Sequence, residues 1–189
     1  MIRVIGIDEV GRGSWAGPLL IVAAQARLNL PVGLKDSKLL SRNQRTRLFD
    51  QIKTTCQIGE GWVSSTEVDE RGLTLAMRLG VKRALAKLQA QPDSKIIIDG
   101  HINYCPREYI NVEAVVDADV FHPIVSAASI YAKVLRDQHM YDQAKLFPNY
   151  GFDQHVGYGT QLHLERLKQF GPCVIHRLSY KPIKALTYD

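Results

Sequence analysis

Residues 2–24, IRVIGIDEVGRGSWAGPLLIVAA, decide the fold of this chain. The run over 2–8 is apolar and rich in β-branched residues, and a second apolar run covers 19–24. Between them, the glycines of the segment 11–13 interrupt any regular element. We therefore predict a strand, a turn and a second strand, with an acidic pair where the first strand ends.

Helices and strands alternate along the rest of the chain. Ser41 and Gln44 have the spacing of a capping box, which predicts the start of a helix. The run KIIID at 95–99 is short and continuously apolar, which is typical of a strand buried on both faces of an α/β sheet. The expected elements are helices over 42–54, 66–90, 123–145 and 160–170, strands over 58–63, 95–99 and 112–116, and an aromatic loop over 147–159. This order predicts one α/β layer structure.

Composition excludes several classes of protein. The chain has 189 residues, of which 46% are hydrophobic and 23% charged, so we expect one domain over 1–189 with one hydrophobic core. No apolar run approaches the roughly 18 residues of a membrane span, and no signal peptide is evident, so we expect a cytoplasmic protein without a membrane partner. The three cysteines lie far apart and predict neither disulfides nor a zinc site. The net charge of +5 fits a polyanionic partner but does not establish one.

Acidic residues follow the predicted strands. Asp8 and Glu9 end the first, Asp99 ends the KIIID run, and Asp117 or Asp119 follows the next strand. Ligands of open α/β sheets bind beyond strand ends, and clustered carboxylates repel one another unless protons or cations neutralise them. Mg²⁺ or Mn²⁺ prefers such oxygen ligands, and a two-metal site can hydrolyse a phosphodiester. The alternative is that these acids form turns and cap helices.

The segment Gly11-Arg12-Gly13 adds a second functional candidate. Glycines let backbone N–H groups approach a sugar or phosphate, and an arginine can bind phosphate with two hydrogen bonds. The alternative is an ordinary tight turn with a surface arginine.

Together these stretches resemble the ribonuclease HII family, the type 2 ribonucleases H. The resemblance begins with GIDEVGRG at 6–13 and AGP at 16–18 and continues in the family's order along nearly the whole chain. The further matching blocks are DSK at 36–38, IDG at 98–100, SAASI at 126–130, AKV at 132–134, RD at 136–137, GYGT at 157–160 and HR at 176–177.

The resemblance implies an α/β, RNase H-like fold with a central mixed β-sheet, flanking helices and a helical C-terminal part over about 160–189. It implies an endonuclease that cuts the RNA strand of RNA–DNA hybrids and nicks 5′ of single ribonucleotides in duplex DNA, leaving a 3′-hydroxyl and a 5′-phosphate. Two divalent ions, Mn²⁺ or Mg²⁺, would be held by the catalytic acids Asp8, Glu9, Asp99 and Asp119. The expected partners are those nucleic acids, with no protein partner evident and a monomeric chain.

The same resemblance assigns substrate contacts. Gly11, Arg12 and Gly13 would surround the ribonucleotide and sense its 2′-hydroxyl, and Tyr158 would pack on the sugar of the next, deoxy nucleotide. A 2′-hydroxyl is what distinguishes RNA from DNA at a given position. Lys38 either contacts phosphate or is a solvated loop lysine.

Departures from the family pattern leave alternatives open. The run before the fourth acid is Val-Asp-Ala-Asp, so Asp117 competes with Asp119, which the alignment of the flanking blocks favours. Lys133 either meets the nucleic acid or pairs with an acid, whereas Arg136 is expected to be structural. His176 is expected to hydrogen-bond within the C-terminal part.

Three other identities compete with ribonuclease HII, and a feature of the sequence disfavours each. The sister type, RNase HIII, lacks the arginine that stands here at position 12 and carries an added N-terminal domain. A non-catalytic hybrid-binding protein would have a damaged acidic set, and this chain has all four acids. An unrelated metal-binding domain would leave the GRG, DSK and GYGT blocks unexplained.

Overall fold

A computed structural model describes residues 4–34 and 40–186. Its centre is a mixed sheet of five strands in the order β3-β2-β1-β4-β5. The strands are β1 (Val4–Val10), β2 (Leu19–Ala26), β3 (Cys56–Val63), β4 (Lys95–Asp99) and β5 (Val112–Val115). The pairs β1–β2 and β2–β3 are antiparallel, whereas β1–β4 and β4–β5 are parallel. The predicted mixed sheet is therefore confirmed.

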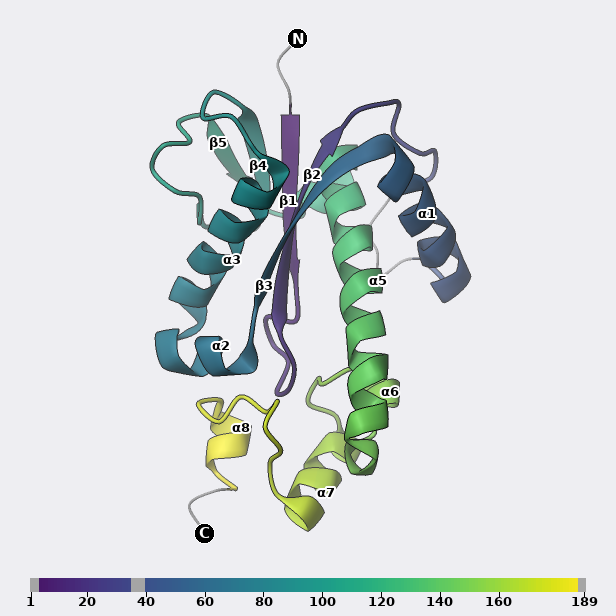
Figure 1. The fold of residues 1–189 in the computed structure, drawn as a ribbon, viewed down its shortest axis with the longest axis vertical. Coiled ribbons are helices and arrows are strands. Elements are labelled where there is room, and N and C mark those ends of the chain that lie inside the picture. Colours follow the sequence, from purple (N-terminus) through teal and green to yellow (C-terminus); the bar gives the residue numbers. More distant parts are fainter. Residues whose placement is uncertain (1–3, 35–39, 187–189) are drawn as a thin grey trace.

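Helices cover both faces of the sheet. One face packs against α2 (Ser65–Arg71) and α3 (Leu73–Leu88), and the opposite face packs against α1 (Arg42–Thr55) and α5 (Pro123–Leu146) (Figure 1). Alternation along β1 divides its side chains between these faces: Ile5 and Ile7 belong to the α3 core, and Val10 belongs to the α5 core. Asp8 therefore lies on the side of α5.

The predicted helix starts are partly right. At Ser41, the hydroxyl accepts a hydrogen bond from the Gln44 N–H at 3.3 Å, and the Gln44 side chain accepts one from the Ser41 N–H at 2.8 Å, so the capping box is confirmed. The single helix expected over 66–90 is wrong. Gly72, at a φ of 74°, ends α2 and precedes α3, and the periodicity of the leucines did not register this break.

The C-terminal part is helical, as expected, but contains more elements than predicted. The segment 147–159, expected to be a loop, holds the 3-10 turn η2 (Pro148–Tyr150) and the short helix α6 (Phe152–His155). These are followed by α7 (Gln161–Phe170) and α8 (Lys181–Lys184). They gather beyond one end of the sheet, around a separate apolar cluster that includes Phe152 and Leu167 (Figure 1).

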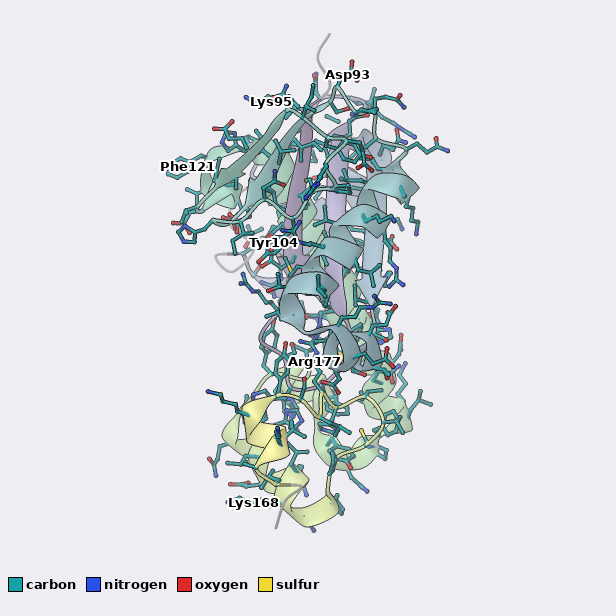
Figure 2. The ribbon with its side chains drawn as sticks, turned by 90° about the vertical axis from the view of Figure 1, so that its left-hand side faces the viewer. Asp93, Lys95, Tyr104, Phe121, Lys168 and Arg177 are labelled. Atoms are coloured by element: carbon teal, nitrogen blue, oxygen red, sulfur yellow. The ribbon has the colours of Figure 1, made fainter. Side chains whose placement is uncertain are left out.

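Two fully buried arginines join this C-terminal part to the sheet. Arg136 of α5 and Arg177 are both 0% exposed, and their guanidinium groups donate to backbone carbonyls of the segment between β1 and β2. Figure 2 shows Arg177 where the C-terminal part meets the rest of the molecule. The structural role expected for Arg136 is thus confirmed.

Two further observations concern the cysteines and the helices. All three cysteines, Cys56, Cys105 and Cys173, are free thiols. Among the described residues, no helix is long and apolar enough to cross a membrane.

Candidate active site

The four predicted acids line one pocket. Because β1 and β4 are parallel with Ile7 opposite Ile98, the next residues, Asp8 and Asp99, end up side by side at the same edge of the sheet. The short helix α4 (Ala118–Phe121), which the sequence did not predict, brings Asp119 to this edge. The pocket has a volume of about 430 Å³, and its lining comprises Asp8, Glu9, Val10, Gly11, Arg12, Gly13, Asp99, Asp119, Ser129, Lys133 and Tyr158.

The pKa of Asp8 is strongly raised by its surroundings. Its side chain is buried, and burial together with the nearby carboxylates of Glu9 and Asp99 raises its pKa to about 8. Hydrogen bonds from the Ser129 hydroxyl and from the Glu9 N–H, the latter at 2.7 Å, oppose this rise. Asp8 therefore holds a proton at neutral pH unless a cation balances its charge.

Glu9 faces the same pocket although it is Asp8's neighbour in a strand. Alternation would send the two side chains to opposite faces, but the strand ends at Val10 and both carboxylates line the cavity. Burial raises the pKa of Glu9, the Arg12 guanidinium 3.6 Å away lowers it, and Asp99 raises it further. An acidic pair at the end of a strand can thus serve a single site.

The structure distinguishes the two aspartates that compete for the fourth position. Asp119 is 7% exposed and lines the pocket. Asp117 is exposed, has a left-handed φ of 53° before α4, and is absent from the lining. The turn is fixed from both sides, since the Ala118 N–H donates to Asp99 Oδ1 at 2.7 Å and the Ser126 hydroxyl donates to the Asp119 carbonyl at 2.6 Å.

The glycine turn and Tyr158 line the same pocket as the acids. Gly11 has a φ of 86°, and a Cβ at this position would lie 2.8 Å from the Pro18 carbonyl oxygen, so the turn requires glycine. The Gly11 N–H donates to the Tyr158 hydroxyl at 3.2 Å. The Arg12 carbonyl accepts hydrogen bonds from Arg177 at 3.1 Å and from the Tyr180 hydroxyl at 2.7 Å, so the C-terminal part holds the turn from behind.

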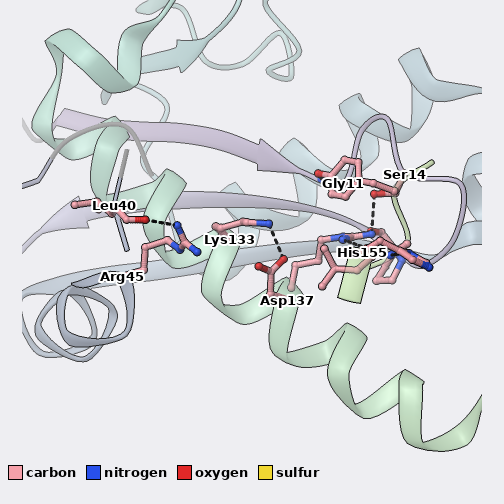
Figure 3. A network of polar contacts seen from close by, with 12 residues as sticks. Gly11, Ser14, Leu40, Arg45, Lys133, Asp137 and His155 are labelled. Carbon is pink, nitrogen blue, oxygen red and sulfur yellow. Dashed lines mark hydrogen bonds and ion pairs between the residues drawn. The ribbon is translucent and has the colours of Figure 1, made fainter. Parts of the chain in front are cut away.

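Sequence reasoning did not assign Ser129 to the site and left Lys133 open. In the sequence Ser129 stands within the SAASI block at 126–130, and its spacing of three from Ser126 places both hydroxyls on one helix face. Lys133 lines the pocket, forms an ion pair with Asp137 at 2.9 Å and lies 5.9 Å from the centre of the Tyr158 ring (Figure 3). Lys38, the remaining predicted contact, lies outside the described residues.

The donor chemistry of this site suits a hard divalent cation. Its charged ligands would all be carboxylate oxygens, and a cation would offset the burial and the neighbouring carboxylates that together raise the pKa of Asp8. Within residues 4–34 and 40–186, no group of three or more His, Cys, Asp or Glu side chains is already drawn together as a metal cage. The carboxylates therefore surround a pocket and do not form a closed coordination shell.

The mixed sheet with covering helices and acids at the ends of its central strands defines a hydrolase of the RNase H-like class. A family model described as Ribonuclease HII matches residues 5–183. The chain belongs to the ribonuclease HII family. It is accordingly an RNase H-type endonuclease, of a family that acts on RNA–DNA hybrids, depends on divalent metal ions and produces 5′-phosphates.

Individual relatives agree with this assignment. A Ribonuclease HII of Bordetella avium (strain 197N) is 42% identical over 187 residues, covering 96% of this chain and 90% of the relative. The structure of the PCNA:RNase HII complex from Archaeoglobus fulgidus contains a chain with a TM-score of 0.80 and 25% identity, covering 95% of this chain and 96% of that one. Bst-RNase HIII, solved in complex with Mn²⁺, shares the fold at a TM-score of 0.73 and 21% identity, covering 98% of this chain and 69% of that one.

Proposed function

We propose that this chain nicks duplex DNA on the 5′ side of an embedded single ribonucleotide, in addition to cutting the RNA strand of longer hybrids. The observation that carries the proposal is the meeting, in one pocket, of four acids with the glycine turn and Tyr158. The first group suits phosphodiester hydrolysis, and the second suits recognition of a sugar. A nuclease without ribose selectivity would need only the acids.

Asp8, Glu9, Asp99 and Asp119 would hold two divalent cations, Mg²⁺ or Mn²⁺. The bound cations would supply an activated water and a stabilised leaving oxygen. Ser129 would orient the Asp8 carboxylate, as its hydrogen bond to that group indicates. The Mn²⁺ complex of Bst-RNase HIII, which has the same fold, supports the choice of ion.

Ribonucleotide recognition would use the backbone of residues 11–13. The chain here is held rigidly, because the Arg12 carbonyl is bound by two side chains of the C-terminal part. Backbone donors and acceptors fixed in this way can test for a 2′-hydroxyl at short range. Tyr158, whose hydroxyl accepts a hydrogen bond from the Gly11 N–H, would pack on the neighbouring sugar.

The basic side chains at the pocket would contact the phosphates. Arg12 is half exposed at its side chain and lies 3.6 Å from Glu9, so it can turn from that weak ion pair to a phosphate. We retain Lys38 as a second candidate on the resemblance alone.

The remaining proposals concern partners and setting. We propose one catalytic domain over 1–189, a monomer, acting in the cytoplasm on hybrids and ribonucleotide-containing duplexes. The Archaeoglobus fulgidus relative was solved with PCNA, so a sliding clamp is the first protein partner to test.

The decisive experiment incubates the protein with a labelled DNA duplex containing one ribonucleotide and with the matched all-DNA duplex, each with Mg²⁺ or Mn²⁺. We expect a single nick 5′ of the ribonucleotide and none in the all-DNA control. No nick with either ion would refute the proposal.

A matched pair of variants tests the fourth acid. Asp119→Asn should abolish cleavage because its carboxylate lines the pocket, whereas Asp117→Asn should retain most activity because that side chain is exposed and does not line the pocket. Equal losses in the two variants would contradict the assignment of Asp119.

A further inference from the structure

Three histidines form a buried cluster behind the proposed sugar-binding wall. His163 is 0% exposed, His176 is 2% exposed and His155 is 7% exposed. The rings of His155 and His163 stack with their centres 4.4 Å apart, and His163 Nε2 lies 3.0 Å from His176 Nε2. Nothing in the proposed hydrolysis uses these imidazoles.

The hydrogen bonds of His163 and His176 admit one consistent placement of protons. The Cys173 N–H donates to His176 Nδ1 at 2.9 Å, so that nitrogen carries no proton and the proton of His176 is on Nε2. His176 Nε2–H then donates to His163 Nε2, and the proton of His163 must be on Nδ1. That Nδ1–H donates to the Tyr158 carbonyl at 3.0 Å.

The opposite placement conflicts with this geometry. A proton on His176 Nδ1 would point toward the Cys173 carbonyl at 3.2 Å, but it would also meet the N–H of the same residue at the shorter distance of 2.9 Å. A chain of hydrogen bonds therefore runs in one direction, from the Cys173 backbone through two neutral imidazoles to the Tyr158 backbone.

His155 fixes the residue just before Tyr158. Its Nδ1 accepts a hydrogen bond from the Gly157 N–H at 3.2 Å, and its Nε2 donates to the Tyr150 carbonyl at 2.9 Å. The Gly157 carbonyl accepts a hydrogen bond from the backbone N–H of Trp15 at 2.8 Å. The peptide groups before and after Gly157 are thus both held, the first by the His155 side chain and the second by the backbone of Trp15.

The electrostatic surroundings agree with neutral rings. Burial lowers the pKa of His163 to about 4 and that of His176 to about 4. Hydrogen bonds to the Tyr158 and Cys173 backbones oppose the shifts, while the neighbouring imidazoles, His155 among them, add to them. Both rings keep single donors and single acceptors at neutral pH.

We propose that His163, with His176 behind it, is a positioning residue that sets Tyr158 against Gly11 and thereby sets the preference of the enzyme for a ribonucleotide followed by a deoxyribonucleotide. The inference rests on the proposed role of Tyr158 in the preceding section. The path is short: His163 binds the Tyr158 carbonyl, and the hydroxyl of the same tyrosine accepts from the Gly11 N–H at 3.2 Å.

The test compares two substitutions at one position with a matched control. His163→Leu removes the donor to the Tyr158 carbonyl, whereas His163→Asn keeps a side-chain N–H close to the place of Nδ1. Leu167→Ala is the control, because Leu167 is a buried residue of the same helix, in the apolar cluster of the C-terminal part, and makes no bond in the histidine chain. Each protein is assayed for kcat/KM on a duplex with one ribonucleotide and on a uniform RNA–DNA hybrid.

The quantity compared between variants is kcat/KM on the duplex with one ribonucleotide divided by kcat/KM on the uniform hybrid. We expect His163→Leu to lower this ratio about fivefold, the size expected from one lost hydrogen bond, and His163→Asn to stay within about twofold of the wild type. Leu167→Ala should lower stability and leave the ratio unchanged. An unchanged ratio in an active His163→Leu enzyme would overturn the proposal, and so would an equal fall in the Leu167→Ala control.

NMR provides a readout that does not depend on activity. Long-range nitrogen–proton correlations of the wild type should place the proton of His163 on Nδ1 and that of His176 on Nε2. In His163→Asn the amide signals of Gly11 and Tyr158 should stay near their wild-type positions, and in His163→Leu they should move. Finding the reverse tautomers would overturn this inference, whether or not the wild type is active. A wild type that cuts neither substrate would refute the proposed function instead, and the NMR result would stay independent of it.

Discussion

Replacing Arg136 with alanine should strongly destabilise this fold. The guanidinium is fully buried and donates to four acceptors: the Pro18 carbonyl at 3.1 Å, the Ala16 carbonyl at 3.1 Å, the Val156 carbonyl at 2.6 Å and the Ser14 hydroxyl at 2.9 Å. Leaving a buried acceptor unpaired costs about 1–3 kcal/mol. At about 1.5 kcal/mol each, toward the low end of that range, the four acceptors together account for a loss of about 6 kcal/mol.

The buried cation is itself unfavourable, and this offsets part of the loss. Burial lowers the pKa of Arg136 to about 10 from 12.5, which corresponds to about 3 kcal/mol that alanine would recover. The cavity left by the side chain adds about 1 kcal/mol back to the cost. The expected net loss is therefore about 4 kcal/mol, or a fall in Tm of about 8–16 °C for a chain of this size.

Thermal and urea unfolding followed by circular dichroism would measure this loss. Arg136→Lys keeps the charge but cannot reach four acceptors with one ammonium group, so it should recover less than half of the lost stability. Arg47→Ala, at an exposed position of α1, is the matched control and should change stability by less than about 0.5 kcal/mol. A loss below about 1 kcal/mol in Arg136→Ala would show that water replaces the guanidinium and would refute the reasoning.

Three further predictions concern the site, the histidines and a helix cap. Asp99→Asn should abolish turnover while hybrid binding, measured by fluorescence anisotropy, survives; unchanged turnover would remove Asp99 from the site. The lowered pKa of His163 and His176, about 4 against an ordinary 6.5, means that the unfolded chain binds more protons between these values, so stability should fall as pH drops from 6.5 to 4, by about 3 kcal/mol per imidazole. In urea titrations His163→Asn should show a shallower fall, and an identical slope would contradict this origin. Ser41→Ala removes a capping box and should cost about 1 kcal/mol in the same assay, whereas a neutral effect would mean that the cap does not hold α1.

The sequence predicts well those features that depend on neighbouring residues. The apolar, β-branched run before the glycines of 11–13 placed β1, and the Ser41–Gln44 spacing placed the start of α1. The relative place of Asp8 and Asp99 also follows from the sequence, once two parallel strands that each end in an acid are inferred. Such patterns are local, and the physical rules that interpret them operate over a few residues.

Features that depend on distant residues were not predictable in the same way. Arg136 was expected to be structural, but its partners lie up to 122 positions away, and no local pattern names them. The break at Gly72 was hidden because the leucines that carry the helical period all follow it, so their spacing says nothing about where the preceding helix ends. The role of His163 depends on the direction of its hydrogen bonds with His176 and Tyr158, which only the folded arrangement defines.

The two halves of the pocket are supported by different parts of the fold. The acids Asp8 and Asp99 stand on the ends of two paired strands of the central sheet, so their positions depend on the core between the sheet and its helices. The positions of the glycine turn and Tyr158 depend on the C-terminal part, because Arg177 binds the Arg12 carbonyl and His163 binds the Tyr158 carbonyl. A substitution that removes one of these two bonds should therefore change which nucleotide is accepted before it changes the chemistry of cleavage. Loosening the sheet beneath the acids should act in the opposite order, because the carboxylates would lose their spacing while the turn around Arg12 keeps its bonds.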